Sequence, residues 1–472
     1  MRFARPLVLL AIIGALTQPR SPAADSAAPL ARIAFGSSAS QEKPQPIWDA
    51  VVAAKPDLFL FLGDCIYGDT DNPEVLKAKY AQLAAVPGYQ KLLATCPVLA
   101  TWDDHDYGVH DGGADFPAKN ASKAVFLDFF REPADSTRRK RPGVYGSWLF
   151  GPEGKRVQVI LLDTRYFRSP LKHGPDGYAP NTDPGATILG EEQWAWLEKQ
   201  LAAPADLRLI GSSIQVVAED HQFEKWMNFP RERDRLFRLL RDTKANGVVF
   251  LSGDRLLGEL SATDAGLGYP LFDLTSSGLN MAAKRWRPAE KNTHRVATMT
   301  AGDNFGLVAI DWDRTPPRVS LQVRDADGDV AIQQKFDLTL LRPNAAIAAT
   351  TGSGETAPAA AKPATTPRAV TPAEAAKKVN ETVTLEMTVR ATGKARDGSR
   401  VFLNSANFQD VDNFTVVLDV RKVGDALKAA GVADPAAYYR GKAVRVTGPV
   451  TLYREKPQIV VEDAGQIAVV EK

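Results

Sequence analysis

The chain has 472 residues, 44% of them hydrophobic and 24% charged, so it is long enough for two or three domains with substantial cores. Its formal net charge is only +2, which excludes a global electrostatic attraction to nucleic acid or to an anionic membrane. Either partner would need a local patch of charge.

The first 24 residues are predicted to be a secretory signal peptide. Arg2 and Arg5 precede an apolar run from Pro6 to Leu16, and small residues follow it. The run is short for a transmembrane span, and an uncleaved anchor is the alternative. We therefore expect a periplasmic or secreted protein that is not stably inserted in a membrane after cleavage.

Only two cysteines occur, Cys65 and Cys96. A domain of this size does not depend on disulfides, even in an oxidising compartment. Two buried free thiols are favoured over a bridge between them.

Short apolar strands alternate with amphipathic helices from residue 31 to residue 343. The strands end in Asp, Ser or Arg and are predicted in "RIAFGS", "DLFLFLGD", "CPVLATWDDHD", "RVQVILLDTR", "LRLIGSSIQ" and "GVVFLSGD". Helices are predicted in "NPEVLKAKYAQLAAV", "GEEQWAWLEKQLAA" and "PRERDRLFRLLRDTKANG". This alternation predicts an α/β fold with one catalytic rim at the carboxyl ends of its strands.

The composition changes after residue 343. Residues 344–374 are rich in Ala, Thr and Pro without apolar periodicity, which predicts a disordered linker. Residues 375–472 alternate apolar and polar residues between turns, with a short helical insert. This pattern predicts a small closed barrel of the oligonucleotide/oligosaccharide-binding type, or OB-fold.

Two segments offer metal ligands directly after strands. In "FLGDCIYGDT", Asp64 can bridge two cations and Tyr67 can bind a strongly acidic ion as phenolate. In "TWDDHDYGVHDGG", four carboxylates and two imidazoles occur within residues 103–111, a density that favours a metal or catalytic site over a solvated loop. There Asp104 is a candidate ligand and His105 a candidate general acid for a leaving alkoxide.

Two further segments offer cations and a carboxylate. Arg165 and Arg168 follow the strand in "LLDTRYFRSP", where a guanidinium can hold a phosphate bidentately; pairing of one or both with surface carboxylates is the alternative, at least as favoured for Arg168. Asp254 and Arg255 follow the strand in "GVVFLSGDRLLGEL". The carboxylates suit hard cations and a phosphate ester, whereas a Gly-x-Ser-x-Gly elbow, a Walker-type loop and paired Cys-x-x-Cys motifs are absent from the sequence.

These segments, taken in order, resemble the PhoD-like (alkaline phosphatase D) metallophosphatases. The resemblance covers Ile33 to Leu341 and is carried by "FGSSASQ", "FLGDCIYGDT", "ATWDDHDYG", "LLDTRYFRSPL", "SSIQVV" and the Ser-Gly-Asp-Arg turn with "GEL". It implies a calcineurin-like four-layer αββα sandwich, a cluster of iron and calcium or comparable divalent ions such as magnesium, and hydrolysis of phosphomonoesters or phosphodiesters.

The resemblance also implies roles for individual residues. Asp64 matches the bridging aspartate, Tyr67 the ligand tyrosine and Asp254 the aspartate of the last metal-binding turn. Asp104 and His105 are similar to the Asn-His pair of the wider metallophosphoesterases, as ligand and leaving-group acid. Arg165 is then a catalytic phosphate clamp, and Arg255 is a second candidate for substrate binding.

The chain departs from the family pattern at several positions. Ser38 stands where the family has a cysteine ligand, and Leu256 stands where it has a histidine. His110 lies where an asparagine ligand is expected and can replace it as a neutral ligand, whereas Cys65 stands where asparagine is usual but need not touch metal. Loss of even an indirect partner of a metal typically costs about 10 to 100-fold in affinity or activity.

Two functions therefore remain open. The first is an exported metal-dependent phosphoric ester hydrolase, and the second is a catalytically impaired binding scaffold with the OB-like domain as its working part. In that domain Lys442, Arg445, Tyr453, Arg454 and Lys456 would form a basic face that suits single-stranded nucleic acid, although a solvated docking face is favoured.

Overall fold

The computed structural model describes residues 28–285, 289–343, 369–378, 382–395, 398–406, 410, 413–429, 431–432, 434–453, 456–461 and 466–470. The chain divides into two compact units, Met1–Gly354 and Glu355–Lys472. The predicted signal peptide and most of the predicted linker lie outside the described residues. Residues Pro372–Ala375 form a short helix, α10, so ordered structure begins before the predicted domain boundary at residue 375.

The first unit contains two large mixed β-sheets. The first sheet has the order β15-β14-β13-β1-β2-β3, and the second has the order β12-β10-β11-β9-β8-β5-β4. The strands of the first sheet are β1 (Arg32–Gly36), β2 (Leu58–Leu62), β3 (Val98–Thr101), β13 (Asn304–Asp311), β14 (Arg318–Asp325) and β15 (Val330–Asp337). Those of the second are β4 (Gly146–Phe150), β5 (Val157–Leu161), β8 (Leu207–Ser212), β9 (Val248–Ser252), β10 (Gly258–Thr263), β11 (Leu271–Ser276) and β12 (Arg295–Met299).

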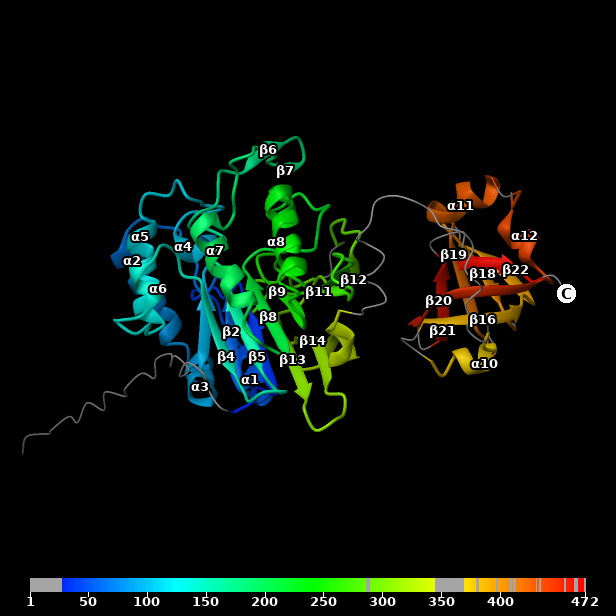
Figure 1. Ribbon diagram of the computed structural model, residues 1–472, viewed down its shortest axis with the longest axis horizontal. Helices are drawn as coiled ribbons and strands as arrows, with labels where there is room; N and C mark the ends of the chain where they lie inside the picture. Colours follow the sequence, from blue (N-terminus) through cyan, green and yellow to red (C-terminus); the bar gives the residue numbers. More distant parts are fainter. Residues whose placement is uncertain are drawn as a thin grey trace, which may run out of the picture. The chain divides into compact units, whose positions relative to one another are not determined.

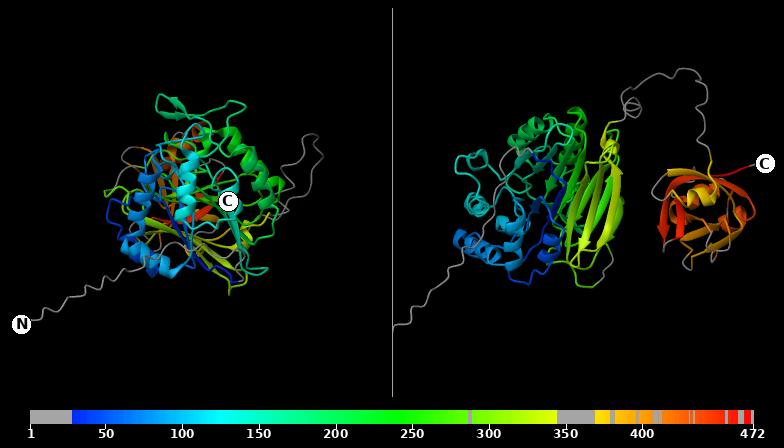
Figure 2. Two further views of the ribbon diagram at one scale, coloured as in Figure 1. Left: turned by 90° about the vertical axis from the view of Figure 1, so that its left-hand side faces the viewer. Right: turned by 90° about the horizontal axis from the view of Figure 1, so that it is seen from below.

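Helices cover the outer faces of the two sheets (Figures 1 and 2). The first sheet packs against α1 (Ile47–Ala53), α2 (Pro73–Ala84), α3 (Pro87–Thr95) and α5 (Lys119–Phe129), whose buried side chains share one core cluster with it. The second sheet packs against α7 (Gly190–Leu201) and α8 (Pro230–Asp242) in another cluster, which also fills the space between the sheets. The predicted four-layer αββα sandwich is confirmed.

Strand β2 shows why the sequence folds into these layers. All five residues of its sequence LFLFL are buried. Leu58, Leu60 and Leu62 point into the core between the sheets, while Phe59 and Phe61 point into the core under the helices. Successive side chains of a strand alternate between faces, so a strand covered on both sides must be apolar throughout.

The parallel strands bring polar loops to common edges. Strands β1, β2 and β3 run parallel in the first sheet, and β5, β8, β9 and β11 run parallel in the second. The residues that follow these strands therefore meet at the carboxyl edges, as the sequence predicts.

Several elements complete this unit. The sequence pattern did not predict helices α1, α3 and α5, nor the hairpin of β6 (Lys172–Gly174) and β7 (Gly177–Ala179). The remaining short helices are α4 (Asp104–Tyr107), α6 (Thr137–Lys140), η1 (Trp226–Asn228) and η2 (Leu338–Leu341). Cys65 and Cys96 are both buried and free, as expected.

The second unit is built around a curled sheet of order β16-β20-β21-β19-β18-β17, with β22 paired to β20. Its strands are β16 (Thr382–Thr388), β17 (Ala391–Lys394), β18 (Arg400–Asn404), β19 (Thr415–Asp419), β20 (Ala443–Tyr453), β21 (Lys456–Val461) and β22 (Ile467–Val469). Helices α11 (Val420–Ala429) and α12 (Pro435–Tyr439) occupy the predicted insert. This arrangement is compatible with an OB-like domain, although no pairing of β16 with β17 closes the barrel within the described residues.

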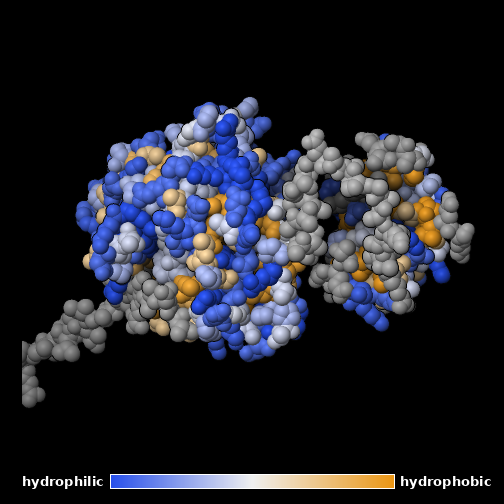
Figure 3. Space-filling view, viewed as in Figure 1, coloured by the Kyte–Doolittle hydropathy of each residue, from blue (hydrophilic) through white to orange (hydrophobic). Residues whose placement is uncertain are grey.

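The surface of the first unit is mostly hydrophilic on the face in Figure 3, with small scattered apolar areas. In the part of the chain that the structure describes, every helix is too short or too polar to cross a membrane.

The core between the sheets gives a stability prediction. Replacing Leu60, which is fully buried, with alanine should lower the free energy of unfolding by about 2–5 kcal/mol, because it removes apolar contacts and leaves a cavity. Leu340→Ala, at a position that is 44% exposed, should change it by less than about 1 kcal/mol. Tryptophan fluorescence during denaturation measures this unit alone, since all 8 tryptophans precede residue 313. Equal losses in the two variants would contradict the packing described here.

Candidate metal centre

Loops at the carboxyl ends of four strands converge on one site. Asp64 follows β2, Asp103 and Asp104 follow β3, Asp254 follows β9 and Ser38 follows β1. Asp64, Asp254 and Ser38 have left-handed backbone conformations, with φ values of 49°, 66° and 63°. Such conformations are uncommon outside glycine, and three of them in the loops of one site indicate tight turns directly after the strands.

Three buried carboxylates form the centre of this site. One oxygen from each of Asp64, Asp103 and Asp104 lies within 4.8 Å of the others, and all three side chains are buried. Among the described residues, Oδ1 of Asp64, Oδ2 of Asp103 and Oδ1 of Asp104 accept no hydrogen bond. Buried charged oxygens without a partner are costly, and a cation between them would remove that cost.

The electrostatics of Asp64, Asp103 and Asp254 point the same way, whereas Asp104 differs: despite burial, the hydrogen bond from His110 and the charge of Arg165 hold the pKa of Asp104 below its usual range. Burial and the neighbouring Asp104 and Asp103 raise the pKa of Asp64 well above its usual range. Burial likewise raises the pKa of Asp254, and Asp103 raises it further. Burial and Asp104 raise the pKa of Asp103 to about 7 despite the opposing effect of Arg165. Without a positive ion at the centre, the folded chain therefore holds protons on carboxylates that would otherwise be ionised.

Asp103 was not assigned as a ligand from the sequence, but its side chain is firmly held. Its Oδ1 accepts hydrogen bonds from Arg165 Nε at 2.5 Å and from Ser213 Oγ at 2.6 Å. Because Oδ1 is occupied, Oδ2 is left to face the other carboxylates. Arg165 and Ser213 thus orient a ligand oxygen toward the centre of the site.

Arg165 is consequently not the phosphate clamp that the sequence predicts. Its side chain is fully buried between Asp103 and Glu224, with Nη1 2.6 Å from Glu224 Oε2. Glu224 also pairs with Arg168, whose Nε lies 2.9 Å from Oε1; this carboxylate is buried, whereas the alternative for Arg168 was a pair at the surface. A substrate phosphate could reach Arg165 only by displacing a buried carboxylate, so the arginine is a positioning residue.

The two histidines of the second segment flank Asp104. His110 Nδ1 lies 2.9 Å from Asp104 Oδ2, and its side chain is 74% exposed. The hydrogen bond to Asp104 is the main reason that the pKa of His110 is raised to about 9. His105 Nδ1 lies 2.6 Å from Asp69 Oδ1, which leaves Nε2 as the nitrogen that can exchange a proton.

His105 is suited to act as an acid. Burial lowers its pKa, but the hydrogen bond to Asp69 and the charge of Asp104 outweigh that effect, so the net shift is upward. Asp104, His105 and His110 each offer a ligand atom within 4.8 Å of the others, so the same residues form a second ligand-type group. The structure therefore brings the predicted His105 and His110 together with Asp104.

Tyr67 and Asp254 lie at the edge of the carboxylate centre. The Tyr67 ring lies 4.1 Å from the His105 ring, measured between centroids, and burial and Asp64 raise the pKa of its hydroxyl. Asp254 is close enough to Asp64 to influence it electrostatically, but it is not one of the three oxygens that meet within 4.8 Å. The arrangement leaves Tyr67 and Asp254 as candidate ligands beside that core.

The two departures from the family pattern are neighbours in space. Ser38 Oγ lies 2.9 Å from Ser277 Oγ. Ser277 Oγ also accepts a hydrogen bond from the Leu256 backbone nitrogen at 2.9 Å. Leu256 also has a left-handed backbone, with φ of 54°, which is unfavourable for leucine and far more common for histidine or asparagine. The turn thus keeps a backbone suited to a histidine while its side chain can donate nothing to a metal.

The donor set fits a metal ion. Carboxylate oxygens with an adjoining imidazole and phenol suit hard cations such as calcium or magnesium, and the phenol would also suit ferric iron. The serine hydroxyl at position 38 lacks the charge of a thiolate and disfavours a thiophilic ion at that point.

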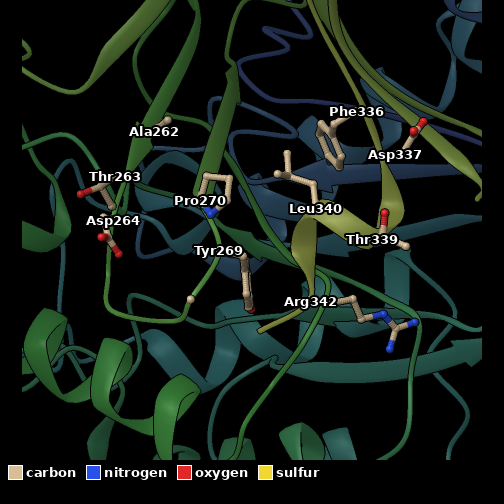
Figure 4. A pocket seen from close by; sticks show the side chains of 11 residues that line it. Ala262, Thr263, Asp264, Tyr269, Pro270, Phe336, Asp337, Thr339, Leu340 and Arg342 are labelled. Carbon is tan, nitrogen blue, oxygen red and sulfur yellow. The ribbon is translucent and has the colours of Figure 1, made fainter. Parts of the chain in front are cut away.

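A cavity of about 810 Å³ lies elsewhere, among residues of the β10–β11 connection and η2 (Figure 4). Tyr269, Pro270, Phe336 and Leu340 give it a largely apolar lining. Thr263 is paired with Leu271 at one end of β10 and β11, and Gly258 with Ser276 at the other. The cavity therefore lies at the end of the sheet remote from Asp254.

Fold and site together define a mixed α/β sandwich with an acidic, metal-type centre at its strand ends. Comparison with known proteins gives a family match. Residues 35–256, slightly less than half of the chain, match the family model described as PhoD-like phosphatase.

One curated relative and two solved structures show what the chain is similar to. Alkaline phosphatase D of Bacillus subtilis (strain 168) is 25% identical over 242 residues, which are 42% of this chain and 41% of that protein. The match thus spans about two fifths of the relative's length. The structure of PhoD has a TM-score of 0.55 at 19% identity and covers 68% of this chain and 73% of that one, which establishes a shared fold. A dimetal phosphatase from Danio rerio is more distant, with a TM-score of 0.41, 14% identity and coverage of 66% of this chain and 99% of that one.

Metal binding gives the next prediction. Asp64→Asn should weaken the affinity for a divalent cation by more than about 100-fold, because it removes one of three charged oxygens. Asp71→Asn, at an exposed position seven residues on, is the matched control and should bind as the natural chain does. Isothermal titration with calcium or magnesium, together with metal counting by mass spectrometry, measures both. Unchanged binding by Asp64→Asn would rule out this centre.

The raised carboxyl pKa values predict a pH dependence of metal binding. A cation requires Asp103 to be ionised, whereas the metal-free fold keeps its proton until about pH 7. Metal affinity should therefore rise as the pH increases from 5.5 to 7.5, with release of at least one proton per ion. Titrations in two buffers of different ionisation enthalpy count the protons released. An affinity that fell over this range would contradict the ligand role of Asp103.

Proposed function

We propose that the chain is a metal-dependent phosphoric ester hydrolase that acts on phosphomonoesters or phosphodiesters. The observation that carries this proposal is the set of three buried carboxylate oxygens without hydrogen-bond partners at the ends of β2 and β3. The PhoD-like domain that contains them supports phosphate ester chemistry.

In this proposal the residues of the chain divide the work. Asp64, Asp103 and Asp104 would hold the metal, with His110, Tyr67 and Asp254 beside them. Bound metal ions would supply Lewis-acid activation of the phosphoryl group and of a water nucleophile. His105, fixed through Nδ1 by Asp69, would protonate the leaving oxygen from Nε2.

The positioning groups keep this arrangement rigid. Arg165 fixes Asp103, and Glu224 fixes Arg165 and Arg168 together. Arg168 also donates a hydrogen bond to the Asp111 carbonyl, which is in the loop that carries His110. One buried ion-pair chain thus joins the β3 ligand to the loop that carries the exposed histidine.

A catalytically impaired scaffold is the second candidate, and a specific observation favours it. Ser38 and Leu256 occupy adjoining places where the family supplies a thiolate and an imidazole, and they share Ser277 as a hydrogen-bond partner. A metal held on that side would have fewer strong ligands. The carboxylate centre and His105 are nevertheless retained, and we give hydrolysis precedence for that reason.

Two further points are part of the proposal. The arginine-flanked apolar segment at residues 1–24 supports export to the periplasm or beyond.

For the second unit we favour a docking role over nucleic-acid binding. Arg445 of the supposed basic face pairs with Glu386 at 2.9 Å, and the Lys442 ammonium lies 3.4 Å from the centre of the Tyr438 ring.

Hydrolysis is tested on purified full-length protein with bis-p-nitrophenyl phosphate and p-nitrophenyl phosphate. The natural chain should contain stoichiometric metal and release p-nitrophenol, and Asp64→Asn should fall to background while Asp71→Asn does not. Removal of metal with a chelator should abolish turnover, and added metal should restore it. This result would eliminate the scaffold alternative.

The double variant Ser38→Cys/Leu256→His restores the two family residues and so distinguishes the hydrolase from the impaired scaffold. If the natural chain is an impaired enzyme, kcat/KM should rise by about 10 to 100-fold for each restored group. If the present ligand set is already complete, kcat/KM should change little. An inert natural chain with an active double variant would establish the scaffold.

A further inference from the structure

A cavity of about 570 Å³ lies beside the candidate metal centre, between the β6–β7 hairpin and the loop that joins β8 to η1. The loop supplies His221 and Lys225, and the hairpin supplies Tyr178. The backbone nitrogen of Tyr178 donates to the Gln222 carbonyl at 2.8 Å, which holds the two elements together. A volume of this size is ordinary for a small-molecule site.

His221 is the unusual group in this cavity. It is 5% exposed, and neither of its ring nitrogens has a hydrogen-bond partner among the described residues. Buried polar atoms in native proteins nearly always have a partner, so an unpartnered imidazole in a cavity wall indicates a ligand that contacts it.

The charges around His221 indicate which ligand. The charged side chains near enough to act on the ring are Arg255, Lys225 and Arg295, all of them cations. Together with burial they lower the pKa of His221 to about 2, so the ring is neutral and carries one N–H donor. A neutral N–H donor with cations near it suits an oxyanion.

Lys225 is the cation most in need of a counterion. It is 4% exposed, and its Nζ donates to the Phe223 carbonyl at 3.1 Å. No carboxylate lies within ion-pair distance of it among the described residues, although Asp220 and Glu224 act on it from further away. A buried ammonium without a paired charge is costly, and a bound anion would offset that cost.

Carboxylates also line the cavity, but the nearest ones have other partners. Glu219 pairs with Arg233 and His294, each at 2.9 Å, and Asp220 pairs with Lys291 at 3.3 Å. Glu290 lies 3.5 Å from Arg255, and Asp176 is exposed on the hairpin. Three of the four lining carboxylates thus lie near bases and Asp176 is exposed, whereas the buried Lys225 has no paired carboxylate among the described residues.

We propose that His221 and Lys225, backed by Arg255, form an accessory site for a phosphate-type oxyanion beside the metal centre. Arg255 connects the two sites, because it directly follows Asp254 and its guanidinium lies 4.1 Å from the centre of the Phe223 ring in the β8–η1 loop. Tyr178 lines this cavity and also a second one next to His110 and Asp111. The oxyanion is either a second phosphate group of the substrate, which rests on the proposed function, or free phosphate.

The site is tested first without the metal. Inorganic phosphate is titrated calorimetrically into full-length protein that has been treated with a chelator and carries Asp64→Asn. Lys225→Met should weaken binding by at least about tenfold, and His221→Leu should also weaken it. Lys225→Arg should retain binding. Lys291→Met, at a lysine that is 75% exposed on the same cavity, is the matched control and should change the affinity less than about twofold.

Absence of phosphate binding to the metal-free chain, or equal binding by the Lys225→Met and natural chains, would overturn the proposal. Circular dichroism and the melting temperature show whether each variant has folded. If Lys225→Met has not folded, the phosphate affinity of His221→Leu tests the proposal in its place. Because no metal or turnover is involved, this result does not depend on whether the chain hydrolyses esters.

The source of the oxyanion is decided with the metal-loaded enzyme. KM is compared for bis-p-nitrophenyl phosphate and for thymidine 5′-phosphate 3′-(p-nitrophenyl phosphate), which carries a second phosphate. If Lys225→Met raises KM only for the second substrate, the site binds the substrate's own phosphate. If both KM values are unchanged while phosphate binding is lost, the site binds free phosphate. A chain with no turnover on either substrate would refute the hydrolase and leave the binding result standing.

Discussion

The mutual repulsion of Asp64, Asp103 and Asp104 is the constraint on which the rest of this site depends. Three carboxylates are buried within one ligand sphere, and each has an oxygen without a hydrogen-bond partner among the described residues. Such a cluster is tolerated only if something holds the side chains in place and something neutralises them. Arg165, Ser213 and Glu224 do the first, and a cation is the natural candidate for the second.

The fold explains why this cluster occurs where it does. Three parallel strands of one sheet and four of the other end near one edge, so sharply turning loops can present several acids to one point. Both faces of these strands are covered, so most of their residues are apolar, and polar residues gather where the strands end. The acidic centre is thus a consequence of burying both faces of each sheet.

Much of this could be predicted from the sequence. Strands β1, β2, β3, β5, β8 and β9, the covering helices α2, α7 and α8, and the grouping of Asp64, Asp104, His105 and His110 follow from apolar periodicity and from the polar residues at strand ends, whereas β4, β10, β11 and β12 were not assigned. The roles of Arg165 and Glu224 could not be predicted, because the burial of a loop residue depends on which distant segment packs over it. Glu224 lies in a polar stretch that carries no local pattern, and its partners are 59 and 56 positions away in the chain. His221 was missed for the same reason.

The β6–β7 hairpin has a wider consequence. It is a short, two-stranded element, yet through Tyr178 it forms part of two cavities and donates a hydrogen bond to the Asp111 carboxylate beside His110. Neither strand belongs to the main sheets, so the hairpin can vary in length and composition without disturbing the core. Substrate choice in such an architecture can diversify by exchange of one surface loop while the metal-binding scaffold stays constant.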